Sequence, residues 1–350
     1  MVDLAPKGLE GVYVDTTEIA TTDKTGNLVY RGYRVIDLAD KTSFENIAYL
    51  VVYGNMPDAE KSRVFSRFLR ENAQISEESR KIAGVMRGRP VIDILRTVVS
   101  SLKSEGMNTD ALLSIAAKFP EIIHSAANSS PAGSKLPEAY PDRFYYLLTG
   151  KEDRKKSRLL EKILIMYMEH EFNASTFALR VTASTMADPV CAFTTALATL
   201  KGPLHGGANS AVLKFLLDIK NREEVKKYVD SALDKKEKIM GFGHRVYKDK
   251  DPRAQYIKKI LLENFQDNPA VQNAVYMEEY IWNKKALAAN VDFYGALYMY
   301  LLGIEEKFYL PIFAAARSFG WVAHYSEQIS NNKLIRPLAH YVGKTDLTLG

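Results

Sequence analysis

Two histidines and one aspartate of this chain stand in segments marked by glycine. His205 lies in Gly-Pro-Leu-His-Gly-Gly, His244 in Gly-Phe-Gly-His-Arg, and Asp292 in Asn-Val-Asp-Phe-Tyr-Gly. A carboxylate can take a proton from the carbon next to a carbonyl group, and imidazoles can donate hydrogen bonds to carbonyl oxygens. Together these groups can form an enol and add it to a second carbonyl. The three residues therefore indicate carbon-carbon bond chemistry.

Other interpretations of the same residues stay open at this point. A single histidine in a glycine-rich turn is usually structural. His205, His244 and Asp292 could instead bind iron or zinc, although their wide separation in the sequence argues against a metal site. The pair His170-Glu171 resembles the start of a zinc-protease motif, but Ala174 stands where the second histidine would be. A helical binding protein without catalysis is a third class.

The composition is that of an ordinary globular protein. Of the 350 residues, 47% are hydrophobic and 25% are charged, and the formal net charge is +5. A chain of this length can bury one large core or two unequal ones. Basic and acidic residues alternate in segments 220–227 and 234–238, which indicates solvated helix faces. We therefore expect no nucleic acid as a partner, and the small positive surplus suits ligands with carboxylates and phosphates.

Cys191 is the single cysteine of the chain, so no intrachain disulfide can form and a reducing compartment is expected. Its neighbours in Pro189-Val-Cys-Ala-Phe193 are apolar, which predicts a buried structural thiol in place of a nucleophile. The first residues show no basic start followed by an apolar run, and no apolar run of about 18 residues occurs later. We expect a cytoplasmic protein with no membrane contact.

Helical periodicity dominates most of the sequence. From Phe44 to Val52 the apolar residues share one helix face, after the capping pattern Thr42-Ser-Phe-Glu45 and before Gly54 and Pro57. The same spacing predicts helices over about 91–102, 160–168, 190–200, 211–219, 255–264, 294–302 and 310–328. The second of these leads directly to His170. These segments predict a mainly α fold.

The first forty residues differ, because they are typical of short extended pieces. Val12 and Val14 alternate with polar neighbours, Lys24-Thr-Gly-Asn27 is a turn signal, and Leu28 begins a second extended run. We expect a small N-terminal β-hairpin here.

Seven motifs together resemble the citrate synthase family, which includes 2-methylcitrate synthase. They occur in the family's order and are His170-Glu-Phe-Asn-Ala-Ser175, Gly202-Pro-Leu-His-Gly-Gly-Ala-Asn209, Met240-Gly-Phe-Gly-His-Arg-Val-Tyr-Lys248, Asp251-Pro-Arg-Ala254, Asn290-Val-Asp-Phe-Tyr294, Ala316-Arg-Ser318 and Ile335-Arg-Pro337. Each motif alone is weak, whereas seven in register are specific. The resemblance extends from about Lys7 to Gly343 and so covers nearly the whole chain.

The resemblance implies a two-domain helical fold. A large, dimer-forming domain would comprise 1–209 and 308–350, and a small inserted domain would comprise 210–307 on the coenzyme side of a cleft. His205 then lies at the junction, while His244 and Asp292 come from the small domain. Closing the cleft would bring the catalytic residues together.

The resemblance also implies an activity: condensation of acetyl-CoA with oxaloacetate and water to citrate and CoA, in the tricarboxylic acid cycle. Asp292 matches the family's base, which removes a proton from the methyl group of the thioester. His205 matches the donor to the thioester oxygen, and His244 matches the residue that polarises and protonates the ketone of oxaloacetate. The acyl-CoA intermediate is then hydrolysed in the same site. No permanently bound cofactor and no metal are implied.

The substrate-binding residues are implied in the same way. Arg253, Arg317 and Arg336 match the family's carboxylate-binding arginines, since a planar guanidinium can bind a carboxylate with two parallel hydrogen bonds. His170 matches a further oxaloacetate ligand. The last arginine reaches the active site of the partner subunit in the family, so Arg336 implies a homodimer.

The coenzyme would bind along one short segment. The family's CoA loop matches Lys238, Ile239, Met240, Gly241 and Phe242, where glycine lets the backbone approach an adenine ring. His324 and His340 are minor candidates for contact with the site.

Two departures from the family's pattern leave some contacts open, and the acyl substrate is open as well. The family often has a second arginine two residues after Arg336, where this chain has Leu338, and histidine before Pro90, where this chain has Arg89. Propionyl-CoA, which would give 2-methylcitrate, is a close alternative to acetyl-CoA, and activity with both is a further one. One methylene in a pocket changes selectivity by about 1–3 kcal/mol, which residue types alone do not decide.

Overall fold

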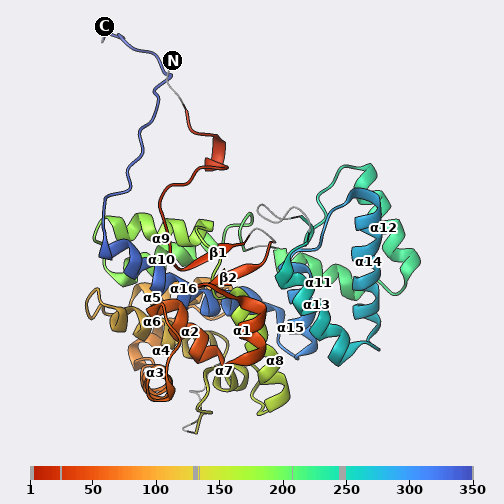
Figure 1. Ribbon diagram of the computed structural model, residues 1–350, viewed down its shortest axis with the longest axis horizontal. Coiled ribbons are helices and arrows are strands. Elements are labelled where there is room, and N and C mark those ends of the chain that lie inside the picture. The colour runs from red at the N-terminus through yellow and green to blue at the C-terminus, as the bar shows by residue number, and fades with distance from the viewer. Residues whose placement is uncertain are drawn as a thin grey trace.

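The chain folds almost entirely into helices (Figure 1). A computed structural model describes residues 4–23, 26–128, 133, 135–206, 208–243 and 250–348, with the side chains of 208–212 excepted. The helices in these ranges are α1 (Val35–Lys41), α2 (Phe44–Tyr53), α3 (Ala59–Glu71), α4 (Glu77–Val85), α5 (Val91–Ser100), α6 (Thr109–Ala127), α7 (Tyr140–Thr149), α8 (Arg154–Tyr167), α9 (Ala174–Ser184), α10 (Pro189–Leu200), α11 (Ala208–Asp218), α12 (Arg222–Asp234), α13 (Pro252–Phe265), α14 (Pro269–Lys285), α15 (Val291–Leu301), α16 (Tyr309–Ser330) and the short 3₁₀ turns η1 (Lys7–Leu9) and η2 (Glu306–Phe308). The predicted mainly α fold is confirmed.

The N-terminal hairpin is also present. Strands β1 (Ala20–Thr22) and β2 (Leu28–Tyr30) pair antiparallel, with Ala20 opposite Tyr30, and β3 (Tyr33–Arg34) continues the sheet on the other edge of β2. Lys24 and Thr25 of the predicted turn lie outside the described residues. The extended piece expected around Val12 and Val14 forms no strand, and both side chains are exposed.

Helix α2 shows how closely local signals set the ends of an element. Ser43 is the N-cap and accepts a hydrogen bond from the backbone N–H of Asn46, while Gly54 ends the helix in the left-handed conformation with φ 86°. The predicted cap, Thr42, lies one residue too early. Its hydroxyl instead accepts from the side chain of Asn46. The predicted partner in the capping box, Glu45, is buried and accepts from the backbone N–H of Tyr140.

Helix α16 forms the centre of the larger group of helices. It packs against α2, α5, α6, α8, α9 and α10, and its buried residues occur on all sides, as expected for a helix inside a core. Gly320 lets α16 lie close to the chain that follows α8, because a β-carbon there would come within 2.6 Å of the backbone oxygen of Met168 and 2.3 Å of Oε2 of Glu169. The core thus brings Arg317 on α16 next to the end of α8.

Helices α11 to α15 form a second group, seen at the right of Figure 1. Within it α12 packs on α14, and both α11 and α13 pack on α15. Side-chain hydrogen bonds join the two groups: the Tyr256 hydroxyl donates to Asp40, and the Tyr145 hydroxyl donates to the backbone oxygen of Leu302. The division into domains at 209/210 and 307/308 stays a prediction.

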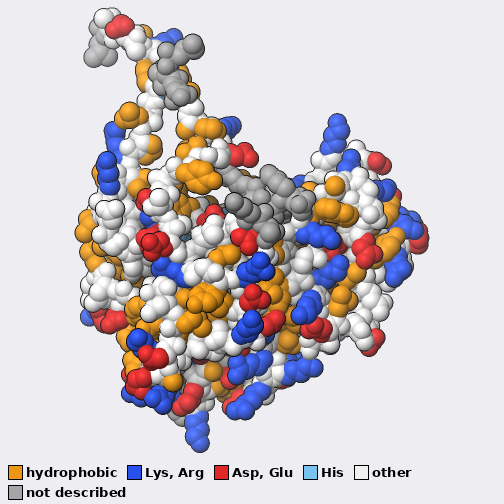
Figure 2. Space-filling model, in the orientation of Figure 1, with side chains coloured by type: hydrophobic (Ala, Val, Ile, Leu, Met, Phe, Trp, Pro, Cys, Tyr) orange, Lys and Arg blue, Asp and Glu red, His pale blue; other side chains and the backbone are white. Residues whose placement is uncertain are grey.

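Charged side chains of both signs are mixed over the face that Figure 2 shows. Segment 220–227 leads into and forms the start of α12, as expected, but α12 ends at Asp234, so the predicted helix face over 234–238 is wrong.

Among the described residues no helix is long and apolar enough to span a membrane. The chain from Asn331 to Thr348 leaves α16 without helix or strand and runs away from the helices, as does the N-terminal segment (Figure 1).

Candidate active site

Two motifs that are far apart in sequence meet just before Asp292. The segment around Phe242 forms an isolated antiparallel bridge with Ala289, and the backbone N–H of Asn290 donates to the backbone oxygen of Gly241 at 2.8 Å. The side-chain amide of Asn290 donates to the backbone oxygen of Gly243 at 3.0 Å. The segment predicted to bind coenzyme is therefore fixed to the loop that leads into α15.

Within the predicted coenzyme segment, backbone and side chains differ in what they can offer a ligand. The side chains of Ile239 and Phe242 are buried, and the ring of Phe242 packs against Phe293 at a centroid distance of 4.7 Å. Gly241 has φ 83°, in the region that favours glycine. Lys238 is exposed and Met240 is half-buried. A ligand here would meet mostly backbone.

Asp292 lies in the first turn of α15. Asn290 is the N-cap, and its side-chain oxygen accepts from the backbone N–H of Asp292 at 3.1 Å. A carboxylate in this position is stabilised by the N-terminal end of the helix. Asp292 is partly exposed, as a group that meets a substrate must be.

His205 lies in the turn between α10 and α11. The turn is closed by hydrogen bonds from the backbone N–H groups of His205 and Gly206 to the backbone oxygen of Gly202, at 2.9 and 3.0 Å. Only glycine fits at 206, because a β-carbon would come within 2.3 Å of the backbone oxygen of Leu200. The turn thus holds the imidazole in a fixed place.

The imidazole of His205 is neutral. Burial, and then the positive charge of Arg317, lower its pKa to about 4. Its Nε2 accepts from the backbone N–H of Ser175 at 3.3 Å, in the first turn of α9, and the Ser175 hydroxyl lies 2.9 Å away. Because a backbone N–H can only donate, the ring proton belongs on Nδ1. A neutral ring with this tautomer can donate a hydrogen bond to a carbonyl oxygen at physiological pH.

Arg317 on α16 is a fully buried cation that lies beside the end of α8. Its Nε donates to the backbone oxygen of Tyr167 at 2.7 Å, and its guanidinium lies over the ring of Phe313 at 4.6 Å. Burial lowers its pKa, while the charge of Glu169 acts most strongly in the opposite direction. Arginine keeps its charge even so. A buried guanidinium of this kind is suited to an anionic ligand.

Arg253 is held by a buried carboxylate at the start of α13. Its Nε and Nη2 donate to Oδ1 and Oδ2 of Asp251 at 3.0 and 2.8 Å, and both side chains are at most 4% exposed. Asp251 is also the N-cap of the helix and accepts from the backbone N–H of Arg253. The orientation of this arginine is therefore fixed before any ligand binds.

Electrostatic interactions link these residues to one another. Arg317 lowers the pKa of His205, and the charges of Arg253 and Asp292 both act on the pKa of Arg317. Residues from α10–α11, α13, α15 and α16 therefore lie within one small region. His170 adjoins it, because it follows α8 directly after Glu169 and is 8% exposed.

Two predicted residues are not brought into this region by the described chain. His244 lies outside the described residues. Arg336 is exposed on the segment after α16, which is fixed near its start by hydrogen bonds from Asn332 and the backbone of Ile335 to Ser184.

His324, His340 and Cys191 also carry predictions from the sequence, and they differ in burial. His324 is fully buried, with its Nε2 3.0 Å from Oε1 of Glu169, whereas His340 is exposed. The prediction that Cys191 is buried is wrong: the side chain is exposed in the first turn of α10, where Asp188 is the N-cap. The neighbouring residues Val190 and Ala192 face the core instead, so an apolar sequence context did not define the side of the helix. Burial of part of the thiol and the nearby Asp188 raise its pKa, which does not favour a nucleophile.

Three polar residues of the site were not singled out from the sequence. Ser175 and Asp251 stand inside the quoted motifs, so their positions were marked but not their contacts. Tyr167 falls within the helix predicted over about 160–168, and nothing in that pattern marks its hydroxyl. Among the described residues no group of three or more His, Cys, Asp or Glu side chains could hold a metal ion.

Known proteins match the chain over nearly its full length. The family model for the citrate synthase C-terminal domain matches residues 8–338. A 2-methylcitrate synthase of Shewanella oneidensis is 36% identical over 97% of this chain and 95% of its own length, and citrate synthase 2 of Bacillus subtilis is 36% identical over 97% and 96%.

Solved structures agree with the sequence comparison. Citrate synthase from Thermotoga maritima superposes with a TM-score of 0.90 at 36% identity, covering 99% of this chain and 98% of that one. The ternary complex of Thermoplasma acidophilum citrate synthase with carboxymethyl coenzyme A and oxaloacetate gives a TM-score of 0.90 at 29% identity, with the same coverage. The chain belongs to the citrate synthase family, and it is an acyltransferase of that family.

Proposed function

We propose that this protein condenses acetyl-CoA with oxaloacetate and water to give citrate and CoA. One observation carries the assignment to these residues: the buried cation Arg317 acts electrostatically on both the neutral His205 and the carboxylate Asp292. An anionic keto acid bound to that cation would have a hydrogen-bond donor and a base beside it. The Thermoplasma relative forms a complex with oxaloacetate and a coenzyme A analogue, which supports the same two ligands here.

Asp292 is the proposed base. Its carboxylate takes a proton from the methyl group of the thioester, and the electron pair moves onto the thioester oxygen. Nδ1 of His205 donates a hydrogen bond to that oxygen as its charge grows. Because the ring is neutral, this donor does not depend on a proton taken from solvent at neutral pH.

The second half of the reaction makes the new carbon-carbon bond. The enol carbon attacks the ketone carbon of oxaloacetate, and the ketone oxygen takes a proton from His244. Water then cleaves the thioester, which gives citrate and the free thiol of CoA. Arg253, Arg317 and His170 bind the keto acid, and the first two present guanidinium groups that suit its two carboxylates.

The remaining contacts involve the coenzyme segment and a second subunit. Residues Lys238 to Phe242 bind the coenzyme through backbone groups, which the burial of Ile239 and Phe242 supports. Arg336 reaches the active site of the partner subunit in a homodimer, and its exposure on the segment after α16 leaves it free to do so. A cytoplasmic location stays a prediction.

Propionyl-CoA is the second candidate substrate, with 2-methylcitrate as the product. The observation in its favour is that a 2-methylcitrate synthase and a citrate synthase are equally similar to this chain, at 36% identity. The difference between the two substrates is one methylene, which gives a selectivity of about 10- to 200-fold at most.

The test is release of CoA thiol from acetyl-CoA and propionyl-CoA in the presence of oxaloacetate. We expect release from both, faster with acetyl-CoA, and loss of about 10² to 10⁴ in rate in Asp292→Asn. A higher kcat/KM for propionyl-CoA would reverse the order of the two candidates. Ligand binding without thiol release would leave a binding protein, and stoichiometric metal in active enzyme would support the metal-site interpretation of His205, His244 and Asp292.

A further inference from the structure

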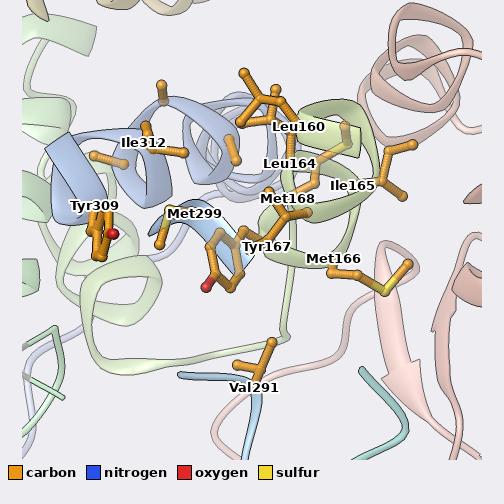
Figure 3. Close-up of a cluster of buried hydrophobic side chains, with 14 of the residues drawn as sticks. Leu160, Leu164, Ile165, Met166, Tyr167, Met168, Val291, Met299, Tyr309 and Ile312 are labelled. Carbon is orange, nitrogen blue, oxygen red and sulfur yellow. The ribbon is translucent and has the colours of Figure 1, made fainter. Parts of the chain in front are cut away.

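Tyr167 has a buried hydroxyl for which the described residues provide no hydrogen-bond partner. The side chain is 0% exposed at the end of α8, and its Oη is unpaired. In Figure 3 the Tyr167 ring extends below the labelled leucines of α8, and its hydroxyl lies on the same side of the cluster as Val291. Polar groups that are this deeply buried are nearly always paired.

Three other buried tyrosines of the same core satisfy their hydroxyls, whereas those of Tyr140 and Tyr309 are also unpaired among the described residues. The Tyr30 hydroxyl lies 3.0 Å from the backbone oxygens of both Ile165 and Glu169, Tyr298 donates to the backbone oxygen of Leu159, and Tyr294 donates to the carboxylate of Glu278. A phenylalanine at 167 would fill the same space without an unpaired donor. Packing alone therefore does not require the hydroxyl of Tyr167, and its surroundings decide what it can do.

The hydroxyl lies against the helix turn that contains Asp292. A β-carbon added to Gly295, three residues after Asp292, would come within 2.3 Å of Oη of Tyr167. Residues three apart lie on the same side of a helix, and helical side chains lean toward the N-terminal end. The side of α15 that Tyr167 contacts therefore includes Asp292.

Charges near the hydroxyl agree with this position. Burial raises the pKa of the Tyr167 hydroxyl well above its usual value. Asp292 is the charge that acts most strongly in the same direction, while Arg253 acts against it and Asp251 with it. The hydroxyl therefore keeps its proton and can serve as a donor.

Only one of these three neighbours is a suitable acceptor. Arg253 has donors only. Asp251 already accepts from the Nε, Nη2 and backbone N–H of Arg253 and from the backbone N–H of Val291. Among the charged neighbours, Asp292 is therefore left as the group to which the hydroxyl can donate. The Tyr309 hydroxyl also acts on Tyr167, but less strongly than Asp292, and a neutral hydroxyl is a weaker acceptor than a carboxylate.

We propose that Tyr167 is a positioning residue for Asp292: its hydroxyl donates to the carboxylate when the substrates are bound and holds it toward the methyl group of the thioester. This inference rests on the proposed role of Asp292 as the base. The Tyr167 hydroxyl, which is unpaired among the described residues, would thus gain a hydrogen bond when the substrates bind. The free energy that burial of this unpaired donor costs the folded protein would be recovered in the complex with substrates.

The test is Tyr167→Phe, with Tyr140→Phe as a matched control. Tyr140 is 1% exposed and its hydroxyl is also unpaired among the described residues, but it packs on Phe44, away from the candidate site residues. In Tyr167→Phe we expect kcat to fall about 10-fold or more, because a misplaced catalytic group loses rate steeply. KM for both substrates should change less than about 2-fold, since no substrate contact is removed. The temperature of unfolding should stay the same or rise in both variants, and the control should keep full activity.

A kinetic isotope effect separates positioning from general damage. With acetyl-CoA deuterated in the methyl group, the isotope effect on kcat should be larger in Tyr167→Phe than in the wild type, because proton removal becomes slower relative to the other steps. An unchanged kcat, or a lower kcat with a lower unfolding temperature and an unchanged isotope effect, would overturn the inference. If instead the wild type releases no thiol, or Asp292→Asn keeps its rate, the proposed function itself fails.

Discussion

The carboxylate of Asp251 joins Arg253 to the residue that precedes Asp292. It binds the guanidinium through both oxygens, and its Oδ2 also accepts from the backbone N–H of Val291 at 3.1 Å. Asp251 is 1% exposed. One buried carboxylate thus fixes the orientation of a proposed substrate-binding arginine and the first turn of the helix that carries the proposed base.

Asp251→Asn should therefore affect both functions together. The amide keeps one acceptor oxygen and replaces the other with a donor, which removes the negative charge that binds the buried guanidinium of Arg253. Removing one partner of a buried pair typically lowers the free energy of unfolding by about 3–5 kcal/mol. We expect a loss of this size in urea unfolding and an increase of about 10-fold or more in KM for oxaloacetate.

The control for this variant is Asp230→Asn. Asp230 pairs with Lys284 at 2.5 Å on the surface, where solvent screens the interaction. The free energy of unfolding and KM should stay close to those of the wild type. Equal effects at both positions would show that pairing at Asp251 has no special role.

His205 should make the stability of the protein depend on pH between about 6.5 and 4. Its pKa is 6.5 without perturbation and about 4 in the folded chain, because burial and Arg317 disfavour the imidazolium. In this range the unfolded chain binds a proton that the folded chain does not. The contribution is fully present above pH 6.5 and is lost as the pH falls, by up to about 3 kcal/mol.

The measurement is urea unfolding of the wild type and of His205→Asn from pH 7.5 to 4. The wild type should lose more stability than the variant over this range, since asparagine does not titrate. Parallel curves would mean that the folded and unfolded chains take up this proton over the same pH range, so that folding does not lower the pKa of His205.

Gly206→Ala should displace the turn that holds His205. The added β-carbon would come within 2.3 Å of the backbone oxygen of Leu200 and 2.5 Å of a methyl group of Leu310, and only the second can move easily. We expect unfolding to become easier by about 1–3 kcal/mol and kcat to fall by about 10²-fold.

Gly202→Ala is the matched variant in the same turn. Its β-carbon would lie 3.2 Å from the backbone oxygen of Thr199, which requires a shift of only a few tenths of an ångström. It should lose far less activity than Gly206→Ala. The comparison by steady-state kinetics separates the steric need at 206 from a general preference for glycine.

Sequence patterns predicted those features of the fold, such as helix ends, that depend on residues close together in the chain. Helix α2 has its glycine stop where expected, and its cap differs by one residue, because serine and threonine can both cap a helix and adjacent candidates leave the first turn open by one residue. Cys191 shows the limit of composition, since its apolar neighbours face the core while the thiol itself points out. The side of a helix is determined by which other helices pack on it.

The candidate site could be named from the sequence only through motifs that resemble the citrate synthase family, and the roles of its residues stay predictions. His205, Arg253, Arg317 and Asp292 were named from motifs, and electrostatic effects link them in the structure. Tyr167 was not predicted, because its meaning depends on an unpaired hydroxyl beside another helix. No pattern within α8 contains that information.

A final prediction concerns the buried pair of Glu169 and His324. Nε2 of His324 lies 3.0 Å from Oε1 of Glu169, and its Nδ1 lies 3.3 Å from Nη1 of Arg180. Arginine can only donate, so Nδ1 accepts and Nε2 carries the proton that is donated to Glu169. The ring thus connects the carboxylate next to His170 with a buried cation.

Replacing His324 should show which of its two hydrogen bonds matters more. A glutamine amide can take the place of Nε2 and keep a donor for Glu169, whereas an asparagine oxygen can take the place of Nδ1 and keep an acceptor for Arg180. Glu169 is 0% exposed, and its Oε2 is unpaired among the described residues, while Arg180 also binds Glu327 and Asp15. We therefore expect His324→Gln to lower the free energy of unfolding less than His324→Asn, with the larger loss near about 3–5 kcal/mol. The reverse order in urea unfolding would place the main role of the ring at Arg180 and would separate His324 from the active site.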